Sequence, residues 1–301
     1  MILEKISRII ISGGFKETRD IQGNAVIYNV SEVLTEEERT KPIPNLPDKM
    51  FEQSMVMHDG KILICGGNDD RKCFVLEQGT WKEHSTLNMK RDCHSTVTTQ
   101  NATFLFGGLY SRATYEYLPK GSKTWILGKT EIPDGVCFGS AVAVKSEQEI
   151  WLIGDNMTNF SKRILSFNIN DHTFRILPFK SKMSRNDHRC AIIPHTNKVM
   201  ITGGYNFDIL NSTEIIDTET GEVTLASPMN TKRAWHGIGI LTIKGEDRVA
   251  VFGGVDGIRL DSVESYNTKT GKWEISNVKL KKPKSNFSFL TVKLSDIISK
   301  P

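Results

Sequence analysis

Three short segments of the sequence share the pattern Arg-x-x-His, and a fourth segment aligns with them. An arginine guanidinium is planar and carries a fork of N–H donors, so it binds carboxylates and phosphates well. Histidine is a common metal ligand. If the segments converge in the fold, they could grip an anionic ligand or hold a metal ion. The residues are Arg91 with His94, Arg185 with His188, Arg233 with His236, and Lys284 with Phe287.

The elements that must position these segments are marked by glycine doublets, each of which closes a short apolar run. The runs recur roughly every 50 residues along the whole chain, which is typical of a stacked or ring-closed repeat. One run, IWLIGD, keeps a single glycine before an aspartate. The glycines are Gly13, Gly14, Gly66, Gly67, Gly107, Gly108, Gly154, Gly203, Gly204, Gly253 and Gly254.

The last complete unit indicates how one repeat is built. Four stretches of strand length, 233–242, 248–252, 261–267 and 272–275, are separated by turns or loops and show no helical period. This pattern predicts a four-stranded antiparallel sheet. The second strand must end with positive φ, where a Cβ would clash, so glycine is expected there.

The two ends of the chain complement each other. The first unit begins almost directly with its second strand at 8–12, and a spare strand at 284–293 follows the last unit. Pairing of these ends would remove two unpaired sheet edges. We therefore predict one domain, 1–301, in which the C-terminal strand at about 284–294 completes the first of six sheets and closes the ring.

The stretches GGVDGIRLDSVESYNTKTGKWE and SPMNTKRAWHG resemble the kelch repeat, and the resemblance extends over the entire chain. It implies an all-β fold, a six-bladed β-propeller of four-stranded antiparallel blades. In kelch domains that serve as substrate receptors, arginines at this place in the repeat grip an acidic peptide at the mouth of the channel. By that resemblance, Arg91, Arg185, Arg233 and Lys284 are expected to form a partial cationic ring there. The alternative is that the arginines only cap or cross-link blades.

The histidines and the loops after the glycines complete the list of candidate contacts. Histidines at the junctions of a six-fold ring would stand too far apart to share a metal ion, so no metal or cofactor is expected and packing is the simpler role. The loops carry residue types that are enriched at binding hot spots. These candidates are Tyr110, Arg112, Tyr205 and Phe207.

Composition narrows the class of protein and its compartment. Of 301 residues 38% are hydrophobic, and the formal net charge of +4 is too small and too scattered to indicate nucleic-acid binding. Neither a signal peptide nor a membrane span is evident. Five cysteines without framework spacing favour a reducing, cytoplasmic setting. Six N-x-S/T sequons leave secretion as the alternative.

The sequence contains no motif that carries a known catalytic mechanism, so catalysis is not expected. Kelch-type propellers include a copper radical oxidase and a sialic-acid epimerase, but their active residues cannot be matched here. We expect a monomeric module that binds another protein, with an acidic peptide segment as the preferred ligand at the channel mouth. By resemblance it would serve as a substrate receptor in ubiquitin ligation or bind actin in the cytoskeleton. The alternative is a secreted or surface propeller that binds or modifies sugars.

Overall fold

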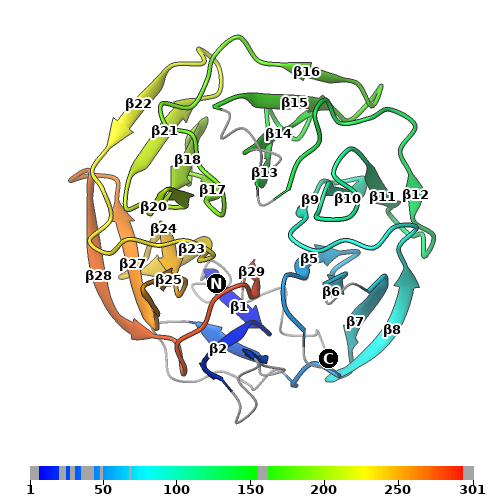
Figure 1. The fold of residues 1–301 in the computed structure, drawn as a ribbon, viewed down its shortest axis with the longest axis horizontal. Coiled ribbons are helices and arrows are strands. Elements are labelled where there is room, and N and C mark those ends of the chain that lie inside the picture. Colours follow the sequence, from blue (N-terminus) through cyan, green and yellow to red (C-terminus); the bar gives the residue numbers. More distant parts are fainter. Residues whose placement is uncertain are drawn as a thin grey trace.

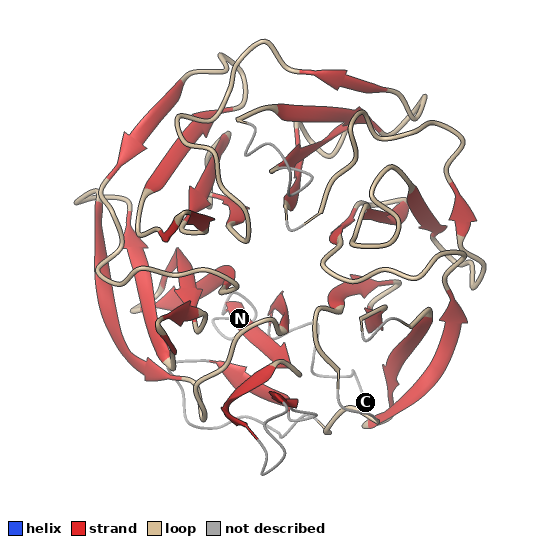
Figure 2. Cartoon of the chain, in the orientation of Figure 1, coloured by secondary structure: helices blue, strands red, loops and turns tan. Residues whose placement is uncertain are grey.

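A computed structural model describes residues 7–19, 25–27, 31–34, 44–47, 50–67, 70–137, 139–154 and 162–293. These residues form strands, turns and loops, and no helix occurs among them. The strands make antiparallel sheets that are arranged like propeller blades around a common centre (Figures 1 and 2). We name each blade by its innermost strand.

Five blades have four strands, written here from the innermost outward. The β5 blade contains β5 (Ser54–His58), β6 (Lys61–Cys65), β7 (Lys72–Glu77) and β8 (Thr80–Thr86). The β9 blade contains β9 (Ser95–Thr98), β10 (Ala102–Phe106), β11 (Tyr115–Pro119) and β12 (Ile126–Leu127). The β13 blade contains β13 (Ser140–Val144), β14 (Glu149–Ile153), β15 (Ile164–Asn168) and β16 (Phe174–Ile176).

The other two blades of this kind carry a small hairpin between their second and third strands. The β17 blade contains β17 (Arg189–Ile192), β18 (Lys198–Thr202), β21 (Thr213–Asp217) and β22 (Val223–Ala226), with the hairpin β19 (Tyr205–Asn206) and β20 (Asp208–Ile209). The β23 blade contains β23 (Gly237–Ile243), β24 (Glu246–Phe252), β27 (Ser262–Asn267) and β28 (Lys272–Lys279), with the hairpin β25 (Val255–Asp256) and β26 (Ile258–Arg259).

The count of six four-stranded blades predicted from the sequence is wrong, because the described residues form five. The remaining sheet, which we call the seam sheet, has three described strands in the order β29–β1–β4. Its members are β29 (Ser288–Lys293), β1 (Ser7–Ser12) and β4 (Ser31–Leu34), beside a separate pair of β2 (Phe15–Arg19) and β3 (Ala25–Ile27). Arg8 stands opposite Val292, and Ser12 stands opposite Ser288, so strands from the two ends of the chain are hydrogen-bonded in one sheet.

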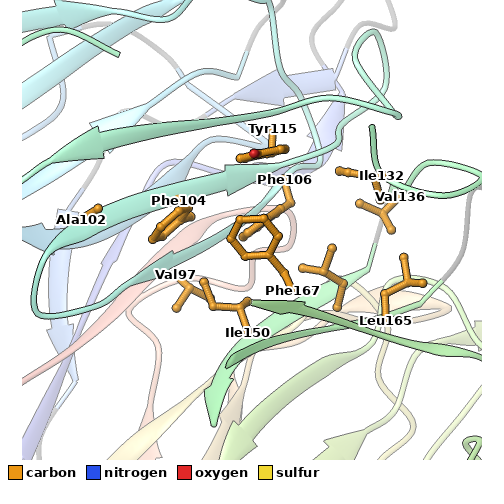
Figure 3. Packing of buried hydrophobic residues seen from close by; sticks show 11 residues of the cluster. Val97, Ala102, Phe104, Phe106, Tyr115, Ile132, Val136, Ile150, Leu165 and Phe167 are labelled. Carbon is orange, nitrogen blue, oxygen red and sulfur yellow. The ribbon is translucent and has the colours of Figure 1, made fainter. Parts of the chain in front are cut away.

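The hydrophobic core lies between blades. Phe106 of β10 meets Phe167 of β15 edge-on, with ring centroids 5.2 Å apart, and Tyr115 of β11 meets the same ring at 5.0 Å (Figure 3). The second strand of each four-stranded blade is covered on both faces, which is why it appears in sequence as an unbroken apolar run. The outermost strands are covered on one face only, so Leu225 and Ile275 remain exposed.

Candidate functional site

The predicted ring of cations at the channel mouth is wrong, because the four side chains are buried. Each lies just before an innermost strand, as expected. However, Arg91 and Arg233 are fully buried, Arg185 is 2% exposed and Lys284 is 1% exposed. A guanidinium enclosed in this way cannot meet a ligand without rearrangement of the blade.

Each buried arginine forms an ion pair with a glutamate on the third strand of its own blade. Arg91 Nε lies 2.9 Å from Glu116 Oε1, and Arg233 Nη2 lies 2.9 Å from Glu264 Oε1. Arg185 pairs with Glu214 in the same way. Burial lowers the pKa of all three guanidinium groups, and the carboxylate partner acts in the opposite direction.

The rest of the hydrogen bonds of each pair tie the blade together. Arg233 Nη1 donates to the carbonyl oxygens of Gly253 (2.9 Å) and Ser262 (3.1 Å), the residues that end one strand region and begin the next. Glu264 accepts from the backbone N–H groups of Asn230 (2.7 Å) and Thr231 (3.0 Å), in the loop that leads to β23. The pair is therefore a cross-link inside the blade, which was the alternative interpretation of the sequence.

The sequence contained a signal for this cross-link. Glutamate occupies the equivalent third-strand position in each blade that has the arginine. Where the arginine position holds Met50 or Val136, the glutamate position holds Phe74 or Leu165, and each of these pairs belongs to one hydrophobic cluster. The arginine and the glutamate are thus present together or replaced together, which indicates that the two side chains contact each other.

The histidines of the Arg-x-x-His segments lie between blades. His94 Nε2 is 2.7 Å from Ser54 Oγ of the preceding blade, and His236 Nε2 is 2.9 Å from Thr202 Oγ1. Burial lowers the pKa of His94 and His188 to about 3, so both rings are neutral at physiological pH. The described residues contain no group of three His, Cys, Asp or Glu side chains that could hold a metal ion.

The glycines of the doublets have positive φ and are also packed against the next unit. A Cβ on Gly66 would stand 2.6 Å from the carbonyl oxygen of Arg91, and one on Gly203 would stand 2.3 Å from that of Arg233. Real Cβ atoms do not approach so closely. The doublets therefore combine a conformational demand with a steric one.

The loops beside the doublets and the loops that lead to the innermost strands form one surface, which we call the loop face. They are linked there by the ion pair Lys232–Asp208 and by a hydrogen bond of 2.5 Å from Ser111 Oγ to the Lys90 carbonyl. Of the predicted contacts, Phe207 is 83% exposed and Tyr110 is 59% exposed. Tyr205 is also exposed, whereas Arg112 is half-buried.

The loop face also carries lysines that were not among the contacts predicted from the sequence. They lie in the loops before β9, β17, β23 and β29 and reach solvent. These residues are Lys90, Lys182, Lys232, Lys281 and Lys282.

A second ring of residues, which we call the inner belt, surrounds the channel. Its described members each lie two residues before an innermost strand and have φ between 53° and 58°; they are Glu52, Cys93, Asp187, Trp235 and Asn286. Backbone N–H groups donate to the neighbouring unit from Trp235 to Asp187 (3.1 Å), from Asn286 to Trp235 (3.2 Å), from Glu52 to Asn286 (3.1 Å) and from Cys93 to Glu52 (3.3 Å). The belt thus links consecutive units at the channel mouth.

The expectation of five reduced cysteines is not met in the structure. Cys65 on β6 and Cys73 on β7 stand opposite each other and form a disulfide, while Cys93, Cys137 and Cys190 are not disulfide-bonded. The bond joins the two strands at the base of the loop between them. Sequence spacing alone had not indicated this pairing.

Comparison with known proteins supports one family. The kelch motif matches residues 188–230 and 248–276, which lie mainly in the β17 and β23 blades. No curated protein matches the sequence. Among the described residues there is no helix with the length and apolar character needed to cross a membrane. These two matched segments and the arrangement of the blades support a kelch-repeat β-propeller.

Proposed function

We propose that this propeller binds another protein on its loop face. The fold is commonly used for protein–protein interaction and is typically non-catalytic. The observation that carries the proposal is the exposure of Phe207 and Tyr110 on loops that a rigid scaffold holds in place. Exposed aromatic side chains of this kind are enriched at binding hot spots.

The same face favours a partner with an acidic segment. Lysines that reach solvent lie in the loops before β9, β17, β23 and β29 and supply positive charge in several neighbouring units. Lysine at such a rim increases the rate of association and the salt dependence of binding more than it increases affinity. The buried arginines support the recognition surface by fixing the loops that carry the lysines.

Partner capture with matched variants tests the proposal. Phe207→Ala and Lys182→Glu change the loop face, whereas Ile275→Ala and Lys272→Glu change outermost strand β28 at comparably exposed positions. We expect the first pair to lose partners that the second pair retains. If all four variants capture the same proteins as the wild type, the loop face is not the binding surface.

The identity of the captured protein would choose between the two roles implied by resemblance. A ubiquitin-ligase subunit or substrate favours a receptor role, and co-sedimentation with filaments favours actin binding. Either role places the protein in the cytoplasm.

The disulfide favours a second candidate, a secreted or surface propeller that binds or modifies sugars. Disulfides persist in oxidising compartments and are rare in the cytosol. Asn101, which begins a sequon, is exposed in a turn. A glycan on Asn101 and three titratable thiols in the native protein would support this candidate, whereas five thiols and no glycan would support the first.

We also infer that the pairing of β1 with β29 closes the ring. The seam sheet contacts β5 on one side and β23 on the other. Deletion of residues 288–301 should therefore expose both neighbouring blades and lower the stability of the whole molecule. An unchanged melting temperature would contradict this inference.

A further inference from the structure

The inner belt surrounds a cavity of about 160 Å³ at the mouth of the channel. This is far more space than one water molecule requires. The cavity is lined by Glu52, Cys93, Asp187, Trp235 and Asn286 of the belt and by the first residues of the innermost strands. None of these side chains has a role in the proposed loop-face contact.

Some residues that line this cavity have a buried polar atom without a hydrogen-bond partner among the described residues. Gln53 is 6% exposed, and its Nε2 donates to the Ser12 carbonyl and to Ser288 Oγ, both at 3.1 Å. Within the described part of the chain, Gln53 Oε1 and Thr96 Oγ1 are buried and have no hydrogen-bond partner. Leaving such atoms unpaired is unfavourable, and a ligand with N–H donors would remove that penalty.

The charges around the cavity do not balance. Among the described residues that line the cavity, Glu52 and Asp187 are opposed by one guanidinium, that of Arg189, so their charges sum to −1 when both carboxyls are ionised. Burial raises the pKa of the Cys93 thiol, which stays neutral. A single positive charge from a ligand would therefore bring the site to neutrality.

The pKa of Asp187 indicates that the Arg189 guanidinium does not fully compensate the negative charge at this site. This carboxyl is 7% exposed, and burial together with Glu52 raises its pKa to about 7, against the opposing effects of Arg189 and a hydrogen bond from Trp235. Arg189 itself donates to the His188 carbonyl at 2.9 Å and lies 5.9 Å from the centre of the Phe289 ring. Its guanidinium is thus drawn toward β29.

We propose that this cavity binds one organic cation, an ammonium or guanidinium group, most directly the end of a lysine or arginine side chain of the partner protein. The N–H donors of such a group would meet the carboxylates of Glu52 and Asp187 and the free acceptor of Gln53. Trp235 also lines the cavity, and an indole can add a cation–π contact to the same cation. The site deepens the proposed function, because the side chain belongs to the protein held on the loop face.

Small blocked amino acids test the cavity without any partner, so the result is independent of partner capture. The probes are the N-acetyl methylamides of arginine, lysine, norleucine and glutamate, titrated into the full chain. The indole N–H resonance of Trp235, assigned with Trp235→Phe, reports binding. We expect arginine and lysine probes to shift it saturably, and norleucine and glutamate probes to leave it unchanged.

Isosteric variants of the acidic and the basic residues should change the affinity for the arginine probe in opposite directions. Glu52→Gln and Asp187→Asn should each weaken binding of the arginine probe at least tenfold, whereas Arg189→Gln should strengthen it because a like charge is removed. Asp171→Asn, in an exposed turn, is the control. Binding should also strengthen between pH 6 and pH 8 as Asp187 ionises beside Glu52, Cys93 and Arg189.

Two results would overturn the proposal. One is saturable binding of the glutamate probe that Arg189→Gln abolishes, which would make the cavity an anion site. The other is an arginine response that the Glu52→Gln/Asp187→Asn double variant leaves intact. If Phe207→Ala loses partner capture but still binds the arginine probe, the cavity and the loop face can be tested independently of each other.

Discussion

The β23 blade and the β5 blade differ in the interactions that hold their second and third strands together. In the β23 blade, Arg233 and Glu264 join the end of one strand, the start of the next and the loop that leads into the blade. In the β5 blade these two positions hold Met50 and Phe74, which lie in one hydrophobic cluster. There the Cys65–Cys73 disulfide joins the strands at the level where the arginine would hold them.

This difference shows that a blade can have either the buried ion pair or two apolar residues at these positions. Replacing a buried ion pair with well-packed apolar residues is often neutral, whereas removing one partner leaves an uncompensated buried charge. A blade can therefore have both charges or neither. The arginines recur because of this internal requirement, which explains why their recurrence did not mark a ligand site.

The largest expected effect comes from breaking one ion pair. Glu264→Ala leaves the Arg233 guanidinium buried without its carboxylate, and we expect the free energy of unfolding to fall by about 3–5 kcal/mol. Urea denaturation measures this change. The control Glu222→Ala, at an exposed turn, should change stability by less than about 0.5 kcal/mol.

The comparison becomes sharper if the β5 arrangement is transplanted. The double variant Arg233→Met/Glu264→Phe should recover at least half of the stability that Glu264→Ala loses, because no charge remains buried. The same urea titration gives the value. A double variant as unstable as the single one would mean that the hydrogen bonds to the loop, and not the charge, dominate.

The disulfide is expected to have an intermediate effect. Closing a loop of this length contributes about 2–3 kcal/mol in the chain-entropy description, so Cys65→Ser/Cys73→Ser should lose about that much. The disulfide-free variant should no longer respond to reductant. Equal denaturation midpoints for oxidised wild type and the variant would show that the bond does not stabilise the blade.

The smallest expected effect on stability at neutral pH concerns the inter-blade histidines. The pKa of His94 is about 3 in the folded protein and about 6.5 when unfolded, so folding excludes a proton. Its contribution is present above pH 6.5 and is lost as pH falls toward 3, by about 1.4 kcal/mol per pH unit. His94→Gln, which copies Gln53 of the β5 blade, should flatten the dependence of unfolding free energy on pH by that amount.

The pH series has an internal check. Asp187 has a raised pKa, so its protonation on folding opposes the histidine effect as pH falls from about 7 toward 4. Asp187→Asn should therefore steepen the loss of stability at acidic pH. A variant that leaves the slope unchanged would indicate that the carboxyl titrates normally.

Sequence reasoning succeeded where a residue type has one physical meaning. Glycine after an apolar run implied positive φ, and the apolar runs marked the buried second strands. It failed where the same type serves two environments, because Arg91 looks alike in sequence whether it faces solvent or Glu116. The inner belt was not anticipated either, since Glu52, Cys93 and Trp235 share a backbone conformation but no chemical type.

The inner belt bears on whether the chain could be circularly permuted. The seam sheet is assembled from both ends of the chain. Even so, the backbone hydrogen bonds that Glu52 donates to Asn286 and that Asn286 donates to Trp235 are of the same kind as those elsewhere in the belt. At the hub, the junction between the termini is thus equivalent to the others. A circular permutant with its break moved to the exposed turn at Gly121 should therefore keep the same axial opening.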